Sequence, residues 1–76
     1  MGEPPIARMD VRDMHCAQAL AQLGVVMKRL ARGAVLELVC NTDDVTRDIL
    51  VWARACHHAV LTTEARGGDT WLNIQK

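Results

Sequence analysis

Cys16 is the residue of this chain best placed to do chemistry. It lies in the stretch MDVRDMHCAQAL, residues 9–20, where a short predicted strand and its turn lead into an amphipathic helical pattern. The first turn of a helix has backbone N–H groups without helical acceptors and carries the positive end of the helix dipole. We expect this terminus, together with Arg12 and His15, to lower the pKa of the thiol. Since the thiolate is the nucleophilic form, Cys16 is a candidate sulfur nucleophile.

A second interpretation of Cys16 stays open. Free cysteines are usually small buried residues without chemistry. In addition, Asp13 places a carboxylate near the thiol, and a negative charge there opposes ionisation. A structural role for Cys16 is therefore the competing hypothesis.

The elements that must position Cys16 follow from the spacing of apolar residues. We expect strands over residues 6–11, 34–40, 58–64 and 70–76, and helices over residues 16–31 and 43–56. Thr42 is a natural N-cap for the second helix. Spacings of three and four define two buried helical stripes: Leu20, Leu23, Met27 and Leu30, and Val45, Ile49, Trp52 and Cys56.

This order of elements predicts an α/β (α+β) fold, a two-layer sandwich with the order β-α-β-α-β-β. Right-handed crossovers place both helices on one face of a four-stranded mixed sheet. Both helices then begin at the carboxyl ends of the first two strands, where open α/β sheets tend to bind ligands. We therefore expect Cys16 and Thr42 to lie at one edge, and residues 56–58 at the opposite edge.

Two further thiols are candidates of lower rank. Cys40 ends the second predicted strand at the edge of Cys16, so it is a possible second or resolving thiol, although a place in the core is favoured. Cys56, His57 and His58 are consecutive at a helix exit, where adjacent residues rarely converge on one ion. We expect no metal site there, and we expect Cys56 to be buried.

The composition narrows the class of protein. The 76 residues fit one small domain over residues 6–76, preceded by a mobile N-terminal tail over residues 1–5. Nine basic residues balance nine acidic ones, and Phe and Tyr are absent, so direct nucleic-acid binding is not expected. Three widely spaced cysteines fit a reducing cytoplasm, and no stretch reaches the roughly 18 apolar residues of a membrane helix.

The last predicted strand suggests a contact surface. Trp71 lies on the face opposite Leu72 and Ile74. Together with Val35 and Val39 it could form an exposed apolar patch, and such patches often mark association. We expect either a monomer with scattered surface apolar residues or a weak homodimer.

The stretch around Cys16 resembles the TusA (SirA-like) family of small sulfur-carrier proteins, whose pattern is close to Leu-Asp-x-x-Gly-x-x-Cys-Pro-x-Pro. Here Met9-Asp10 stands for Leu-Asp, and Cys16 for the persulfide-carrying cysteine. The resemblance continues through the second-helix pattern, the histidine that opens the third strand and the last strand, and so covers roughly residues 7–76. Its matching residues are Thr46, Arg47, Asp48, Ile49, Trp52, His58 and residues 71–76.

The resemblance implies a function and a site. Cys16 would accept a persulfide sulfur from a donor protein and pass it to an acceptor protein, with no cofactor because the sulfur is bound covalently. The residues implied to shape the sulfur site or the partner-facing edge are Arg12, Asp13, His15, Ala17, Gln18, Thr42, Arg47 and Asp48.

The chain departs from the family pattern at several positions. Ala17 and Ala19 replace both prolines, Asp13 replaces the glycine before the cysteine, Thr42-Asp43 replaces Asp-Pro, and His57 stands where glycine is common. Alanine restores backbone donors in the first turn but leaves φ unlocked. The alternative function is therefore a non-catalytic binding or regulatory module on the same scaffold, and the sequence leaves open whether the protein is an enzyme.

Overall fold

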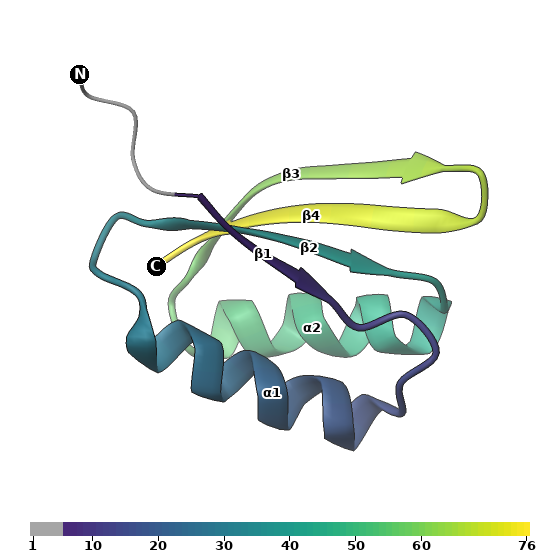
Figure 1. Ribbon diagram of the computed structural model, residues 1–76, viewed down its shortest axis with the longest axis horizontal. Helices are drawn as coiled ribbons and strands as arrows, with labels where there is room; N and C mark the ends of the chain where they lie inside the picture. Colours follow the sequence, from purple (N-terminus) through teal and green to yellow (C-terminus); the bar gives the residue numbers. More distant parts are fainter. Residues whose placement is uncertain (1–5) are drawn as a thin grey trace.

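The computed structural model describes residues 6–76; the tail predicted over residues 1–5 lies outside the described residues. The elements follow the predicted order β-α-β-α-β-β, with bounds within a few residues of those expected (Figure 1). They are β1 (Ile6–Asp10), α1 (Cys16–Arg29), β2 (Val35–Cys40), α2 (Asp43–Ala55), β3 (Ala59–Arg66) and β4 (Asp69–Gln75).

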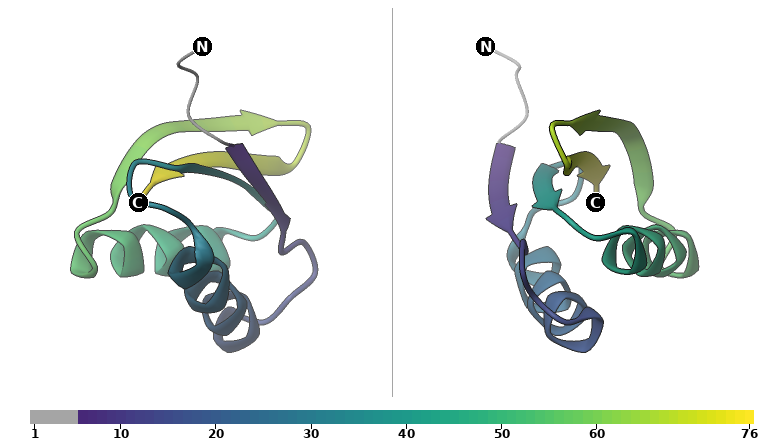
Figure 2. Two further views of the ribbon diagram at one scale, coloured as in Figure 1. Left: turned by 60° about the vertical axis from the view of Figure 1, so that its left-hand side comes forward. Right: turned by 90° about the vertical axis from the view of Figure 1, so that its right-hand side faces the viewer.

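The strands form one mixed sheet in the order β1-β2-β4-β3. β1 and β2 are parallel, whereas β4 is antiparallel to both β2 and β3. Both helices lie on the same face, with α1 towards the β1 side of the sheet and α2 towards the β3 side (Figure 2). The predicted two-layer α/β sandwich is confirmed.

The core lies between this sheet face and the two helices. Alternation along β2 and β4 turns Leu36, Leu38, Leu72 and Ile74 towards the helices, and all four are fully buried. The helices contribute Leu23 and Met27 from α1 and Val45 and Ile49 from α2, together with the alanines Ala19 and Ala53.

The C-terminal end of α2 differs from the prediction. Cys56 is exposed, not buried, because the helix ends at Ala55 and the last buried position of its stripe is Ala53. His57 follows with φ +60°, in the left-handed region that side chains rarely adopt. This conformation explains why the family pattern favours glycine at this position.

The capping residues fix where the helices begin and end. The Thr42 hydroxyl accepts a hydrogen bond from the backbone N–H of Val45 at 3.4 Å, which confirms Thr42 as the N-cap of α2. α1 ends at Arg29, two residues before the predicted end. Gly33, with φ +85°, lies in the turn before β2 and does not directly cap α1.

The open face of the sheet is less apolar than expected. Val39 is only 5% exposed, so the predicted patch with Trp71 and Val35 is wrong for this residue. The guanidinium of Arg66 lies 5.9 Å from the centre of the Trp71 ring and covers part of it. Charged and polar side chains, among them Arg8, Glu37 and Asn73, surround Trp71 on this face and give it a largely polar character.

Candidate functional site

The site is built where both helices begin. β1 and β2 run parallel, so their carboxyl ends lead to the N-termini of α1 and α2 at one edge of the molecule (Figure 1). Cys16 is the first residue of α1 and is half-buried, and His15 is the N-cap in an extended conformation. The structure thus brings Cys16 and Thr42 to the same edge, as the topology predicts.

Asp48 of α2 is the residue that acts most strongly on Cys16. The Asp48 carboxylate raises the pKa of Cys16, chiefly as a hydrogen-bond acceptor near the thiol, and partial burial and the negative charges of Asp48 and Asp44 act in the same direction. The backbone N–H of Cys16 opposes them by stabilising the thiolate. The predicted lowering of the Cys16 pKa is therefore wrong: carboxylates of α2 outweigh the helix terminus.

Arg12 does not counteract the effect of these carboxylates on the pKa of Cys16, because its guanidinium forms ion pairs with other residues. It forms ion pairs with Asp10 at 2.9 Å and with Asp69 at 3.2 Å. The hydrogen bonds from Arg12 hold the pKa of Asp10 below its ordinary value. Arg12 thus ties the end of β1 to the start of β4 at this edge, a role that differs from the predicted activation of the thiol.

Asp13 has a structural task in the loop before Cys16. Its φ is +63°, a left-handed conformation that explains the glycine of the family pattern, and aspartate is among the residues that tolerate it. Asn41 secures this turn: its side-chain oxygen accepts the N–H of Asp13 at 2.9 Å, and its amide donates to the Asp13 carboxylate at 2.9 Å. The predicted opposition of Asp13 to the thiolate is not found; Asp48 and Asp44 supply it.

Ala17 and Ala19 differ in what their backbone can do. The N–H of Ala19 donates to the carbonyl of His15 at 2.9 Å, and its side chain is fully buried. Only Ala17, of the two, lies before the first helical hydrogen bond, so the expectation that both alanines restore free donors is wrong for Ala19. Ala17 and Gln18 are exposed next to Cys16.

Cys40 lies in the core beneath the edge. It is fully buried, and its Sγ is 3.0 Å from the hydroxyl of Thr46. Burial raises the pKa of the Cys40 thiol, and the Thr46 hydroxyl partly opposes this. Cys40 is therefore a core residue whose thiol is not exposed to solvent.

Arg47 lies away from the thiol. Its guanidinium pairs with Asp44 at 2.8 Å, and both side chains are largely exposed. Because successive α-helical residues are rotated by about 100°, Arg47 and Asp48 point to different flanks of α2. Of these two predicted site residues, Asp48 acts on the thiol directly, whereas Arg47 lies about 100° further round the helix and pairs with Asp44.

Sequence reasoning missed Asn41, Asp44 and Thr46. The signal that could have found Asn41 is an aspartate in a glycine position together with an amide at the end of the neighbouring parallel strand. Asp44 acts on Cys16 only because α2 packs beside α1, and Thr46, which the resemblance named without a role, contacts Cys40 only because α2 packs on β2.

The opposite edge holds no comparable arrangement. His57 is exposed, and His58 packs against Trp52 with ring centres 5.3 Å apart. Within residues 6–76 no group of three metal-ligating side chains converges. In the same part of the chain, no helix is long and apolar enough to span a membrane.

Comparison with known proteins agrees with this geometry. Residues 7–76, nearly the whole chain, match the family described as Sulfurtransferase TusA. A comparison with curated proteins gives no match. The family has a general sulfur-carrier role, which implies contact with sulfur-relay partner proteins. With the fold and the cysteine at the start of α1, the match shows that this chain belongs to the TusA sulfurtransferase family.

Proposed function

We propose that this protein carries sulfur as a persulfide on Cys16 and relays it from a donor protein to an acceptor protein in the cytoplasm. One observation supports this most: the Cys16 thiol lies half-buried at the first residue of α1, with the Asp48 carboxylate of the neighbouring helix close enough to raise its pKa. A thiol that is held in place but reachable is what repeated loading and unloading requires.

The chemistry is two successive thiol exchanges. In loading, the Cys16 proton passes to Asp48 or water, and the thiolate sulfur attacks the outer sulfur of a donor persulfide. The new S–S bond forms on Cys16, the donor S–S bond breaks, and the donor leaves as a thiolate. In delivery, an acceptor thiolate attacks the outer sulfur on Cys16, and Cys16 recovers its electron pair and proton. No oxidant, reductant or cofactor is consumed.

Asp48 and the helix terminus have opposite effects on these steps. Asp48 favours the protonated thiol, since it raises the pKa of Cys16. The unpaired N–H groups of the first turn, including that of Ala17, favour the negative charge that appears when the proton leaves. A thiolate of higher pKa is scarcer but intrinsically more nucleophilic, so the raised pKa slows loading without preventing it.

The surface that a partner would meet surrounds Cys16. His15, Ala17 and Gln18 are exposed in the first turn. The Asp13–Asn41 pair fixes the loop that leads to this turn and joins it to the loop before α2. We assign these residues to partner recognition and to presentation of the cysteine, and Asp48 to orientation of the thiol.

The second candidate function is a binding or regulatory module that does not transfer sulfur. It is favoured by the Asp48 contact, which disfavours the thiolate, and by the absence of both family prolines. This second function predicts that the wild type gains no sulfur from a persulfide donor.

The test uses the full-length protein with a low-molecular-weight persulfide as donor. We expect intact-mass spectrometry to show the gain of one sulfur by the wild type and its loss to an excess of free thiol. Cys16→Ser should gain none, whereas the control Cys56→Ser, which alters an exposed thiol, should load as the wild type does. No gain by the wild type would reject the carrier function in favour of the binding module.

A further inference from the structure

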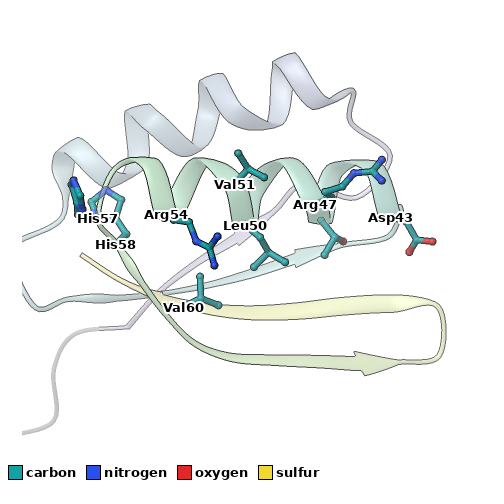
Figure 3. Close-up of a pocket in the computed structure, with 9 residues that line it drawn as sticks. Asp43, Arg47, Leu50, Val51, Arg54, His57, His58 and Val60 are labelled. Carbon is teal, nitrogen blue, oxygen red and sulfur yellow. The ribbon is translucent and has the colours of Figure 1, made fainter.

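A groove with its own chemistry runs along the flank of α2, between this helix and the start of β3 (Figure 3). Its volume is about 810 Å³. It begins near Asp43 at the edge of Cys16 and ends at His57 and His58, so it follows nearly the whole length of α2.

The middle of the groove is apolar. Leu50 points from α2 towards β3, and Val60 points from β3 towards α2 (Figure 3). Val51 forms the upper lip and is 63% exposed. The apolar strip of the groove thus consists of Leu50 and Val60, which face each other, with Val51 at its lip (Figure 3).

The ends of the groove are charged, and their charges are asymmetric. Arg54, His57 and His58 line the end at the C-terminus of α2, without an acidic residue among the lining residues there. Within residues 6–76 Arg54 forms no ion pair. At the other end Arg47 is accompanied by Asp43 and already paired with Asp44. The uncompensated positive charge thus lies at one end.

The groove lies on a flank of α2 next to the one that carries the two carboxylates acting on Cys16. Asp44 and Asp48 are the α2 residues that act on the thiol, whereas Arg47, Val51 and Arg54 face the groove. At about 100° per residue, Asp48 and Arg54 differ by roughly 240° around the helix axis, that is, by 120° on the shorter side. Val51, three residues after Asp48, lies only about 60° from it, so the lip of the groove borders the flank that carries Asp48.

We propose that this groove binds an amphipathic helix of a partner protein, with its apolar stripe on Leu50, Val51 and Val60 and acidic residues against Arg54 and the two histidines. Charge complementarity favours acidic partner residues at the Arg54 end, because within residues 6–76 Arg54 forms no ion pair and no acidic residue lines that end. Asp43, which is likewise in none of the ion pairs of this part of the chain, lies at the opposite end of the groove. The shape selects a helix: the walls are side chains of a helix stripe and a strand face, the setting in which helices pack into grooves.

A partner helix needs only a short length to fill the groove. From Arg47 to Arg54 the groove extends about 10 Å at 1.5 Å per residue, which corresponds to two turns of a bound helix. Apolar residues at spacings of three and four over two turns would fill the strip, with Asp or Glu at the end near Arg54. The inference is independent of the sulfur chemistry, since the residues that shift the pKa of Cys16 are not among those that line the groove.

The experiment selects helical peptides on the full-length protein. The probe is a displayed library of two- to four-turn helices with randomised surface positions. Selected peptides are then measured against wild type, Val51→Glu, Arg54→Glu and the matched control Val25→Glu, which alters a 53% exposed valine on α1. Circular dichroism of each variant verifies that it is folded.

We expect the selected helices to combine an apolar stripe with acidic residues. Their affinity should fall at least about tenfold for Val51→Glu and Arg54→Glu, the loss typical of a central interface residue, and stay unchanged for Val25→Glu. Replacing the acidic residues by lysine should restore binding to Arg54→Glu.

Several results would overturn the proposal. They are the absence of any selected binder, binders without acidic residues, and binders that tolerate Val51→Glu. Extended peptides that bind the β3 edge would indicate strand pairing instead. Self-association of the wild type that Val51→Glu abolishes would make a second copy of this chain the occupant.

Discussion

The first turn of α1 provides a sharp prediction, because Ala17 and Ala19 occupy the two proline positions of the family but use their backbone differently. The N–H of Ala19 donates to the His15 carbonyl at 2.9 Å and thus closes the first helical turn. Ala17 lies before that bond. Ala17→Pro should therefore be tolerated, whereas Ala19→Pro should destabilise the fold.

The magnitude follows from what each proline removes. At residue 19 the substitution deletes one hydrogen bond, and the ring meets the carbonyl four residues earlier, that of His15, at a fully buried position. A proline that breaks the helical ladder costs about 3 kcal/mol. At residue 17 the fixed φ reduces the freedom of the unfolded chain and should stabilise the fold by about 0.4–1 kcal/mol.

Urea and thermal unfolding of the two variants, in reducing buffer, measure this difference. In a domain of this size, 1 kcal/mol corresponds to about 4–8 °C in Tm, so Ala19→Pro should melt on the order of 10–20 °C below wild type. Ala17→Pro is its matched control and should melt at or slightly above wild type. Equal stability of the two variants would refute the reasoning, since it would mean that the helical ladder begins after residue 19.

Other predictions follow from the thiols and the loop. Asp48→Asn should speed alkylation of Cys16 near neutral pH and shift its pH profile to lower pH, whereas the control Asp43→Asn should not; an unchanged profile would exclude the carboxylate contact. The pKa of Cys40 is raised in the fold, so its stabilising effect is complete below the unfolded thiol value of about 8.5 and is lost as pH rises through the folded value. Urea midpoints should therefore fall at alkaline pH and fall less for Cys40→Ala; parallel curves would contradict this. Asn41→Ala should cost about 0.5–1.5 kcal/mol in unfolding free energy, because it removes two exposed hydrogen bonds to Asp13 whose groups can then bind water; a neutral effect would deny Asn41 its role in the loop.

Much of the fold could be predicted because it depends on local patterns. The stripe containing Val45 and Ile49 fixes the buried face of α2, and Thr42 fixes its start. The placement of Cys16 as the first residue of α1 follows from the same kind of signal. Cys56 was misjudged because periodicity alone does not show where a helix stops covering the sheet.

The electrostatics of the site could not be predicted in the same way. The terminus of α1 and the residues beside Cys16 are local features, and they favour a thiolate. Asp48 is 32 positions away along the chain, and it reaches the thiol only because α2 packs beside α1. The sign of the pKa shift thus depends on the distance between two helices, which a single sequence does not provide.

The residues with a left-handed backbone conformation could be predicted in part. The departures from glycine at Asp13 and His57 mark two positions whose φ is positive in the structure. The resemblance pointed to both positions, but only the structure shows that Asn41 stabilises the first of them.

Locating the transferred sulfur tests the central claim most directly. The full-length protein would be loaded from a low-molecular-weight persulfide labelled with a heavy sulfur isotope, trapped by alkylation and digested for peptide mass spectrometry. The proposed function predicts the label on the peptide that contains Cys16, and its disappearance when an acceptor thiol is added before trapping. A label on the Cys56 peptide, or none on any cysteine, would contradict it.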